Sequence, residues 1–171
     1  LADVRLESAI SAIIDLEDSV ACVDGADKVS AYASWLGLMK GDLTSEFEKN
    51  GKKITRSLNS DLSFISPDGD DFSVKSKALL WIRNVGHLMT TPAVIDANGD
   101  EVYEGLLDAM VTTMIGIHDL KKADGNSRHG SIYIVKPKMH GPAEVAFADK
   151  MFSEVETVLG LKQYSVKLGI M

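Results

Sequence analysis

The chain contains one cysteine, Cys22, so it cannot form an internal disulfide. The residues around Cys22 do not have the spacing of metal ligands, and this sparing use of cysteine fits a reducing cytoplasm. No apolar run approaches the roughly 18 residues that a membrane span requires. The first residues, LADVRLESAI, also lack the basic and then apolar layout of a signal peptide. We therefore expect a cytoplasmic protein without a membrane-spanning segment.

Positive charge is scarce as well. Lys and Arg number 18 against 25 Asp and Glu, which gives a formal net charge of −7 at pH 7. Such a balance repels phosphate backbones, so nucleic acid is not expected as a partner. The four histidines show no HxxxH or HExxH spacing, and no GxGxxG or GxxxxGK(S/T) loop is present. These absences argue against a zinc, dinucleotide or P-loop site.

Hydrophobic residues, by contrast, make up 45% of the 171 residues, which is enough for a globular domain with a core. Short apolar runs without strict alternation are typical of strands that are buried on both faces of a sheet. Such strands are predicted at residues 11–16, 78–82, 131–135 and 165–170.

Each of the first three runs is followed by a helical pattern. Asp24 is placed to cap the first helix and Gly41 to end it. Pro142 is placed to begin the third helix and Gly160 to end it. The second helix is expected to bury one apolar face, formed by Leu106, Leu107, Met110, Met114 and Ile117. Strands that alternate with helices predict an α/β fold with a parallel sheet.

Residues 42–77 have a different texture. Polar and apolar residues are mixed there, as in KKITRSLNSDLSFI, and residues 67–69 form a turn signal. We interpret this segment as a small antiparallel excursion outside the sheet. The chain then divides into a strand and helix at 1–41, the excursion at 42–77, and further strands and helices at 78–171.

Polar residues follow three of the predicted strands. In parallel α/β folds the carboxyl ends of the strands bind ligands, and acids, a guanidinium and amines gathered there suit an anionic substrate or a metal-bound carboxylate. A simpler interpretation is that these residues solvate the rim of the sheet, with the arginine in a structural salt bridge. The residues concerned are Glu17, Asp18 and Ser19, then Arg83 and Asn84, then Lys136, Lys138 and His140.

The segments DLEDSVACVDGADKVSAYASWLGLMKGDL, LLWIRNVGHLMTTPAV and NSRHGSIYIVKPKMHGPAEVAFA closely resemble the malate synthase G family. The likeness covers nearly the whole chain. It implies a TIM barrel with an inserted α/β domain, in which the four strands are consecutive strands of the first half of the barrel and 42–77 runs into the insertion. It also implies a magnesium-dependent acyltransferase of the glyoxylate cycle, linked to the tricarboxylic acid cycle, that condenses acetyl-CoA with glyoxylate to malate and CoA.

The resemblance assigns roles to single residues. Arg83 matches the catalytic arginine, which binds glyoxylate and stabilises the enolate oxygen of deprotonated acetyl-CoA. A guanidinium suits this task because it stays charged and offers a planar fork of donors. Ser19 and Arg56 match positions that contact acetyl-CoA. Glu17 and Asp18 match acidic positions near the Mg²⁺ ion, where we expect them to contact its waters rather than the ion.

The direct metal ligands and the catalytic base of the family lie beyond Met171, so we expect the isolated chain to be inactive. The loop KKADGNSRHG is also shorter than its counterpart in the family, between Gly125 and Ser127. The parent protein is expected to be monomeric. Two alternatives remain open at this point: a related magnesium-dependent barrel lyase that acts on malyl-CoA or citramalyl-CoA, and a non-catalytic assembly module.

Overall fold

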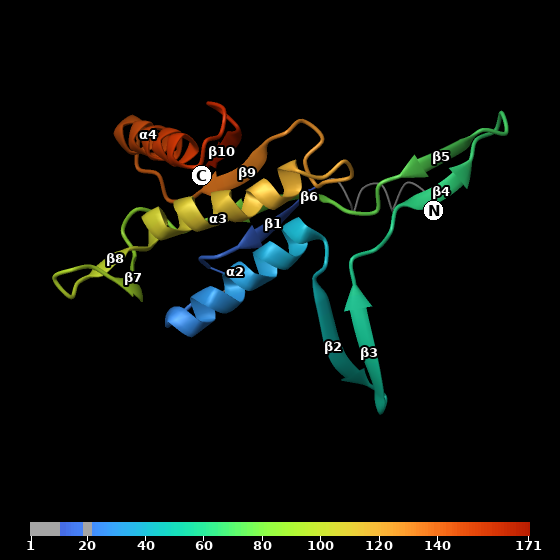
Figure 1. The fold of residues 1–171 in the computed structure, drawn as a ribbon, viewed down its shortest axis with the longest axis horizontal. Coiled ribbons are helices and arrows are strands. Elements are labelled where there is room, and N and C mark those ends of the chain that lie inside the picture. Colours follow the sequence, from blue (N-terminus) through green and yellow to red (C-terminus); the bar gives the residue numbers. More distant parts are fainter. Residues whose placement is uncertain (1–10, 19–21) are drawn as a thin grey trace.

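A parallel sheet of four strands forms the centre of the computed structural model, which describes residues 11–18 and 22–171 (Figure 1). All neighbouring strands in this sheet run parallel, so the predicted α/β class and its four strands are confirmed. In spatial order the strands are β1 (Ser11–Asp15), β6 (Leu79–Arg83), β9 (Ile132–Lys136) and β10 (Val166–Ile170).

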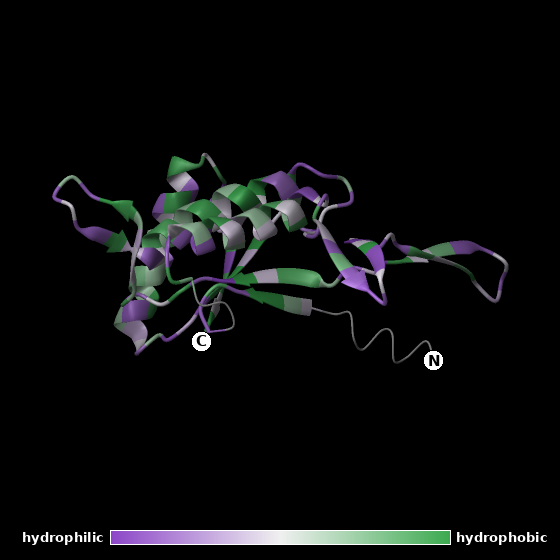
Figure 2. Ribbon diagram, turned by 90° about the horizontal axis from the view of Figure 1, so that it is seen from below, coloured by the Kyte–Doolittle hydropathy of each residue, from purple (hydrophilic) through white to green (hydrophobic). Residues whose placement is uncertain are grey.

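Within the described ranges, three helices cover one face of this sheet (Figures 1 and 2). Ile82 and Ile134 are fully buried between the strands and the helices, together with Trp35 and Phe152. Side chains alternate along a strand, so the neighbouring residues of β6 and β9 point to the other face, which the helices leave uncovered. The helices are α2 (Gly25–Lys40), α3 (Glu104–Leu120) and α4 (Pro142–Val158).

The ends of α2 follow the predicted signals. Asp24 has an extended backbone, and its side chain accepts a hydrogen bond from Asp27 N at 2.9 Å. Asp27 in turn accepts from Val23 N at 3.2 Å, so two backbone donors at the start of the helix are satisfied reciprocally. Gly41 ends the helix in the left-handed conformation with φ of 75°, which a glycine adopts without steric cost.

The predicted apolar face of α3 is wrong in part. Leu106 is 48% exposed and Met114 is 49% exposed, although the hydrophobic pattern placed both in the core. The face that α3 buries instead carries Asp108, Thr112 and Asp119. These polar side chains can be buried because each forms hydrogen bonds with backbone or side-chain groups of the sheet and its loops, so none loses its partners on leaving water.

The predicted antiparallel excursion at 42–77 consists of two hairpins, which project away from the sheet (Figure 1). A third hairpin, which the hydrophobic pattern did not predict, is formed by β7 (Thr90–Ile95) and β8 (Glu101–Tyr103), although the pair Asn98 and Gly99 is a usual turn signal. The first two hairpins are β2 (Thr44–Lys49) with β3 (Lys52–Ser57) and β4 (Leu62–Ile65) with β5 (Asp71–Val74). Across 11–18 and 22–171, none of the helices has the length and apolar content for crossing a bilayer.

The cap of α2 can be tested by substitution. Asp24→Ala removes the acceptor of Asp27 N and should lower the free energy of unfolding by about 1 kcal/mol. Asp24→Asn keeps an acceptor and should lose less. Urea unfolding followed by circular dichroism measures both variants, and equal stability of Asp24→Ala and the parent chain would contradict the cap.

Candidate active site

The carboxyl ends of β1 and β6 place an acid and a guanidinium side by side. Asp15 is the last residue of β1 and Arg83 the last of β6, and the two are paired in register. Leu16 N continues the ladder by donating to Arg83 O at 2.9 Å. In-register neighbours point to the same face, so Arg83 Nη1 reaches Asp15 Oδ2 at 3.1 Å.

A tight turn after β1 turns two more carboxylates toward the same guanidinium. Asp15 Oδ1 accepts from the backbone N–H groups of Glu17 at 2.8 Å and Asp18 at 3.3 Å. Arg83 Nη2 then lies 2.9 Å from Asp18 Oδ2 and 3.4 Å from Glu17 Oε2. From the loop after β9, Lys138 Nζ lies 2.9 Å from Glu17 Oε1 and 3.3 Å from Asp18 Oδ1. We call these five residues the strand-tip cluster.

The ion pairs favour the charged forms of Asp18, Arg83 and Lys138. The hydrogen bond from Arg83, and after it that from Lys138, lowers the pKa of Asp18 although this carboxylate is exposed. Hydrogen bonds to Glu17 and Asp18 raise the pKa of Lys138. Burial opposes the charge on Arg83, but the hydrogen bond to Asp18 and the nearby carboxylates raise the pKa of its guanidinium overall. In this arrangement three carboxyl side chains face one guanidinium and one ammonium group.

Two buried polar atoms of the strand-tip cluster keep unused hydrogen-bonding capacity. Arg83 Nε donates no hydrogen bond, and Glu17 Oε2 accepts none, although an ion pair to Arg83 remains. Buried polar atoms in folded proteins nearly always have a partner, so these two atoms have capacity for a further polar contact.

The other predicted site residues lie elsewhere. Ser19 is outside the described residues. Arg56 is an exposed residue of β3, and its guanidinium lies 4.9 Å from the centre of the Phe47 ring. The hairpin that contains Arg56 follows the carboxyl end of α2. Because α2 runs back along the sheet after β1, this hairpin lies at the opposite end of the sheet from the tip of β6 (Figure 1). The structure thus brings Glu17 and Asp18 to Arg83, but not Arg56.

Two strand-end residues are turned away from the strand-tip cluster. Lys136 is fully buried and donates to Val85 O at 2.6 Å, and the side chain of Asn84 accepts from Thr112 Oγ1 at 3.2 Å. Asp15, in turn, was not singled out in the sequence. Ile13 and Asp15 are two residues apart on β1, so their side chains point to the same face of the sheet. Only with the pairing of β1 and β6 known could the sequence have placed Asp15 beside Arg83 on that face.

The described residues do not form a direct magnesium site. No group of three or more His, Cys, Asp or Glu side chains is arranged to hold a metal ion in the part of the chain that the structure describes. The carboxylates of the strand-tip cluster converge on Arg83 and Lys138 instead.

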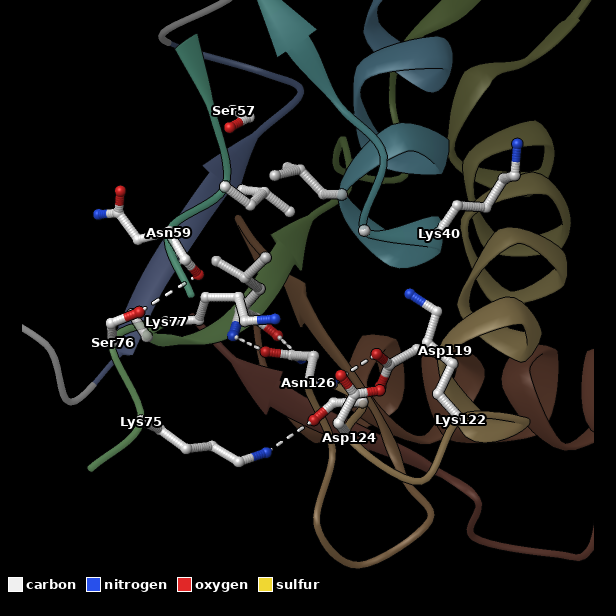
Figure 3. A pocket seen from close by; sticks show the side chains of 16 residues that line it. Lys40, Ser57, Asn59, Lys75, Ser76, Lys77, Asp119, Lys122, Asp124 and Asn126 are labelled. Atoms are coloured by element: carbon white, nitrogen blue, oxygen red, sulfur yellow. Dashed lines mark hydrogen bonds between the residues drawn. The ribbon is translucent and has the colours of Figure 1, made fainter. Parts of the chain in front are cut away.

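A cavity of about 500 Å³ lies at the opposite end of the sheet (Figure 3). Lys75 Nζ donates to Gly125 O at 3.0 Å, and the Asn126 side chain is bound to both backbone groups of Leu80. These contacts tie the loop before β9 to the start of β6. Since parallel sheets bind ligands at the carboxyl ends of their strands, we assign the site to the strand-tip cluster rather than to this cavity.

Both the family model and two individual relatives that match this chain belong to malate synthases. The model of the malate synthase TIM barrel domain matches residues 79–171. Malate synthase G of Halalkalibacterium halodurans is 52% identical over 171 aligned positions, covering 99% of this chain and 24% of that protein. Malate synthase G of Corynebacterium efficiens is 48% identical over 173 aligned positions, covering 100% of this chain and 23% of that protein. The chain thus spans about a quarter of the length of these curated relatives.

The electrostatic coupling in the strand-tip cluster is measurable. Arg83→Gln removes the first cause of the lowered pKa of Asp18, so the pKa of this carboxyl should rise toward its ordinary value. Carboxyl ¹³C NMR titration of labelled aspartates follows it directly. Lys138→Met should give a smaller rise, because its hydrogen bond is the weaker of the two causes. An unchanged titration of Asp18 in Arg83→Gln would show that the ion pair does not form.

Proposed function

Because this chain belongs to the malate synthase family, we propose that the protein of which it forms part condenses acetyl-CoA with glyoxylate to give malate and free CoA. The observation that carries the proposal is the guanidinium of Arg83 at the tip of a parallel strand, where Asp15 and Asp18 hold it and its own Nε donates no hydrogen bond. The protein would then be an acyltransferase of the glyoxylate cycle.

The chemistry demands a fixed cation. A base must remove a proton from the methyl group of acetyl-CoA, which is a very weak acid, and negative charge then develops on the thioester oxygen. The resulting carbanion attacks the aldehyde carbon of glyoxylate, and the aldehyde oxygen takes up a proton to become the hydroxyl group of malate. Water then cleaves the thioester to give the second carboxylate and free CoA. A preorganised donor at the developing oxyanion supplies several kcal/mol of stabilisation when water is excluded.

In this proposal Arg83 supplies that stabilisation. A guanidinium stays charged throughout the reaction, and its planar fork binds both the carboxylate of glyoxylate and the enolate oxygen. Asp15 and Asp18 hold Nη1 and Nη2 in place at 3.1 and 2.9 Å, so no reorganisation is needed when charge develops. Ser19 and Arg56 remain proposed contacts of acetyl-CoA.

Magnesium dependence is part of the proposal and rests on the sequence resemblance. The described residues provide no direct ligand set, so we assign no step to the ion and propose only that Glu17 and Asp18 contact its waters. The excess of carboxylates in the strand-tip cluster is consistent with a nearby cation.

The architecture proposed for the parent protein is a closed barrel. The face of the sheet away from the helices carries Ile13, which is 51% exposed, and the rings of Trp81 and Tyr133, whose centres lie 5.0 Å apart. A TIM barrel closes with eight strands, whereas this sheet has four. We propose that strands from the rest of the protein cover this face, and that 42–77 belongs to an inserted domain. A cytoplasmic, monomeric enzyme remains our expectation.

The role of Arg83 can be tested in the full-length protein. Arg83→Lys keeps the charge but loses the fork, and kcat for malate formation should fall about 10²-fold or more. Arg128→Lys, at an exposed loop arginine, is the matched control and should keep the parent rate. Cleavage of malyl-CoA or citramalyl-CoA without malate formation by the parent protein would favour the lyase alternative and contradict the proposal.

The 171-residue chain alone should form no malate from glyoxylate and acetyl-CoA, even with magnesium present. Its described residues hold no metal-ligand set, and four strands cannot close a barrel around a substrate. A coupled assay for released CoA measures this, with the full-length protein as the positive control. Turnover by the purified chain would overturn this expectation.

A further inference from the structure

Two buried charged side chains hold the backbone of Val85, which lies two residues after Arg83. Asp108 Oδ2 on α3 accepts from Val85 N at 2.9 Å. Lys136 Nζ at the end of β9 donates to Val85 O at 2.6 Å. Both side chains are 0% exposed, and both lie on the helix-covered side of the sheet. The proposed reaction gives neither of them a role.

A network of further buried groups compensates these charges. Lys28 Nζ lies 2.7 Å from Asp108 Oδ1 and 2.6 Å from Glu104 Oε1, and Tyr32 donates to Asp108 Oδ1 at 2.6 Å. Two ammonium groups thus balance two carboxylates. Burial still lowers the pKa of Lys136 to about 8, against the opposing effect of Asp108. Apolar side chains of similar volume can often replace a buried charge network without loss of stability, so stability alone does not explain this one. We explain it by the backbone of Val85, which it holds in place.

The segment that the network holds leads directly to the strand-tip cluster. Arg83 O accepts from Leu16 N at 2.9 Å, and Asn84 N donates to Val135 O at 3.0 Å. Val85 is held by Asp108 and Lys136, and Gly86 N points to Glu17 Oε1 at 3.4 Å. The backbone of residues 83–86 is therefore fixed at each residue, by partners on both sides of the sheet.

Close packing of α3 on this segment depends on a glycine. A Cβ atom at Gly105 would lie 2.7 Å from Gly86 O and 2.7 Å from Lys136 Nζ. Real Cβ atoms do not approach other atoms so closely, so any side chain here forces the loop or the lysine to move. The absence of a side chain at Gly105 lets the start of α3 contact the 83–86 segment.

We propose that Asp108 and Lys136 are positioning residues for Arg83, which act by clamping both peptide groups of Val85 and thereby fixing the strand tip that aims the guanidinium. This inference rests on the proposed function, in which Arg83 binds the substrate. A misplacement of about 1 Å at a catalytic group can cost about 10²-fold in rate, so the clamp should affect turnover more than folding.

The test uses the full-length protein and a pair of matched variants on one helix. Asp108→Asn weakens the clamp. Asp119→Asn changes the other buried aspartate of α3, which accepts backbone N–H groups of Asn126 and Ser127 at the opposite end of the sheet. Both variants should lose thermal stability. Only Asp108→Asn should lose kcat, by about tenfold or more per folded enzyme, since a displaced guanidinium would lose contacts with the enolate oxygen that form only in the transition state.

A second pair tests the same clamp sterically. Gly105→Ala pushes on Gly86 O and Lys136 Nζ, whereas Gly116→Ala, on the same helix, meets the side chain of Ile132 at 2.8 Å. Alanine favours a helix more than glycine does, so helix formation is not impaired in either variant. Gly105→Ala should lower kcat at least about fivefold relative to Gly116→Ala. If both Asp108→Asn and Gly105→Ala keep kcat within about twofold of their controls, the clamp does not position Arg83.

Failure of the proposed function would look different. A parent protein that folds but forms no malate would contradict the proposed function. The clamp would then be tested by a measurement that needs no turnover, the titration of Asp18. The hydrogen bond from Arg83 is the largest cause of its lowered pKa, so displacement of the guanidinium should raise the pKa of Asp18 in Asp108→Asn but not in Asp119→Asn. Equal Asp18 titrations in the two variants would then overturn the positioning role.

Discussion

The in-register contact of Asp15 with Arg83 is the interaction on which the candidate site depends. It requires two strands 68 residues apart in sequence to pair in parallel, with both tips at the same height. Once the pair is formed, Asp15 also closes the turn that carries Glu17 and Asp18 to the guanidinium. One carboxylate therefore links the sheet register, the loop geometry and the electrostatics of the strand tip, and an error of one residue in register would separate them.

The two sides of the β6 tip perform different physical tasks. On the uncovered side, partly exposed ion pairs hold the guanidinium of Arg83. On the helix-covered side, fully buried charges hold the peptide groups of Val85. Buried ion pairs contribute little net stability, but they have strict geometric requirements. This makes them suited to fixing a short backbone segment, which flexible surface contacts would leave mobile.

The sheet is suited to a larger assembly. Its helix-covered face has a packed core, while the opposite face presents Ile13, Trp81 and Tyr133 beside the strand-tip cluster. Covering an apolar surface of this kind lowers the free energy of the protein, because the surface is removed from water. In the protein proposed above, further strands would cover this face. Exclusion of water from the same face would also strengthen the electrostatic action of Arg83.

Local sequence signals determined much of this protein. Short apolar runs identified the strands, Asp24 and Gly41 bounded α2, and the polar residues after each strand included Glu17, Asp18 and Arg83, because these features depend on near neighbours along the chain. Only the tertiary structure decided that Asp15 meets Arg83, that α3 buries Asp108 rather than Leu106, and that Arg56 lies at the other end of the sheet. Register and the burial of charge are set by contacts between segments distant in sequence, and hydrophobic periodicity carries no information about such pairings.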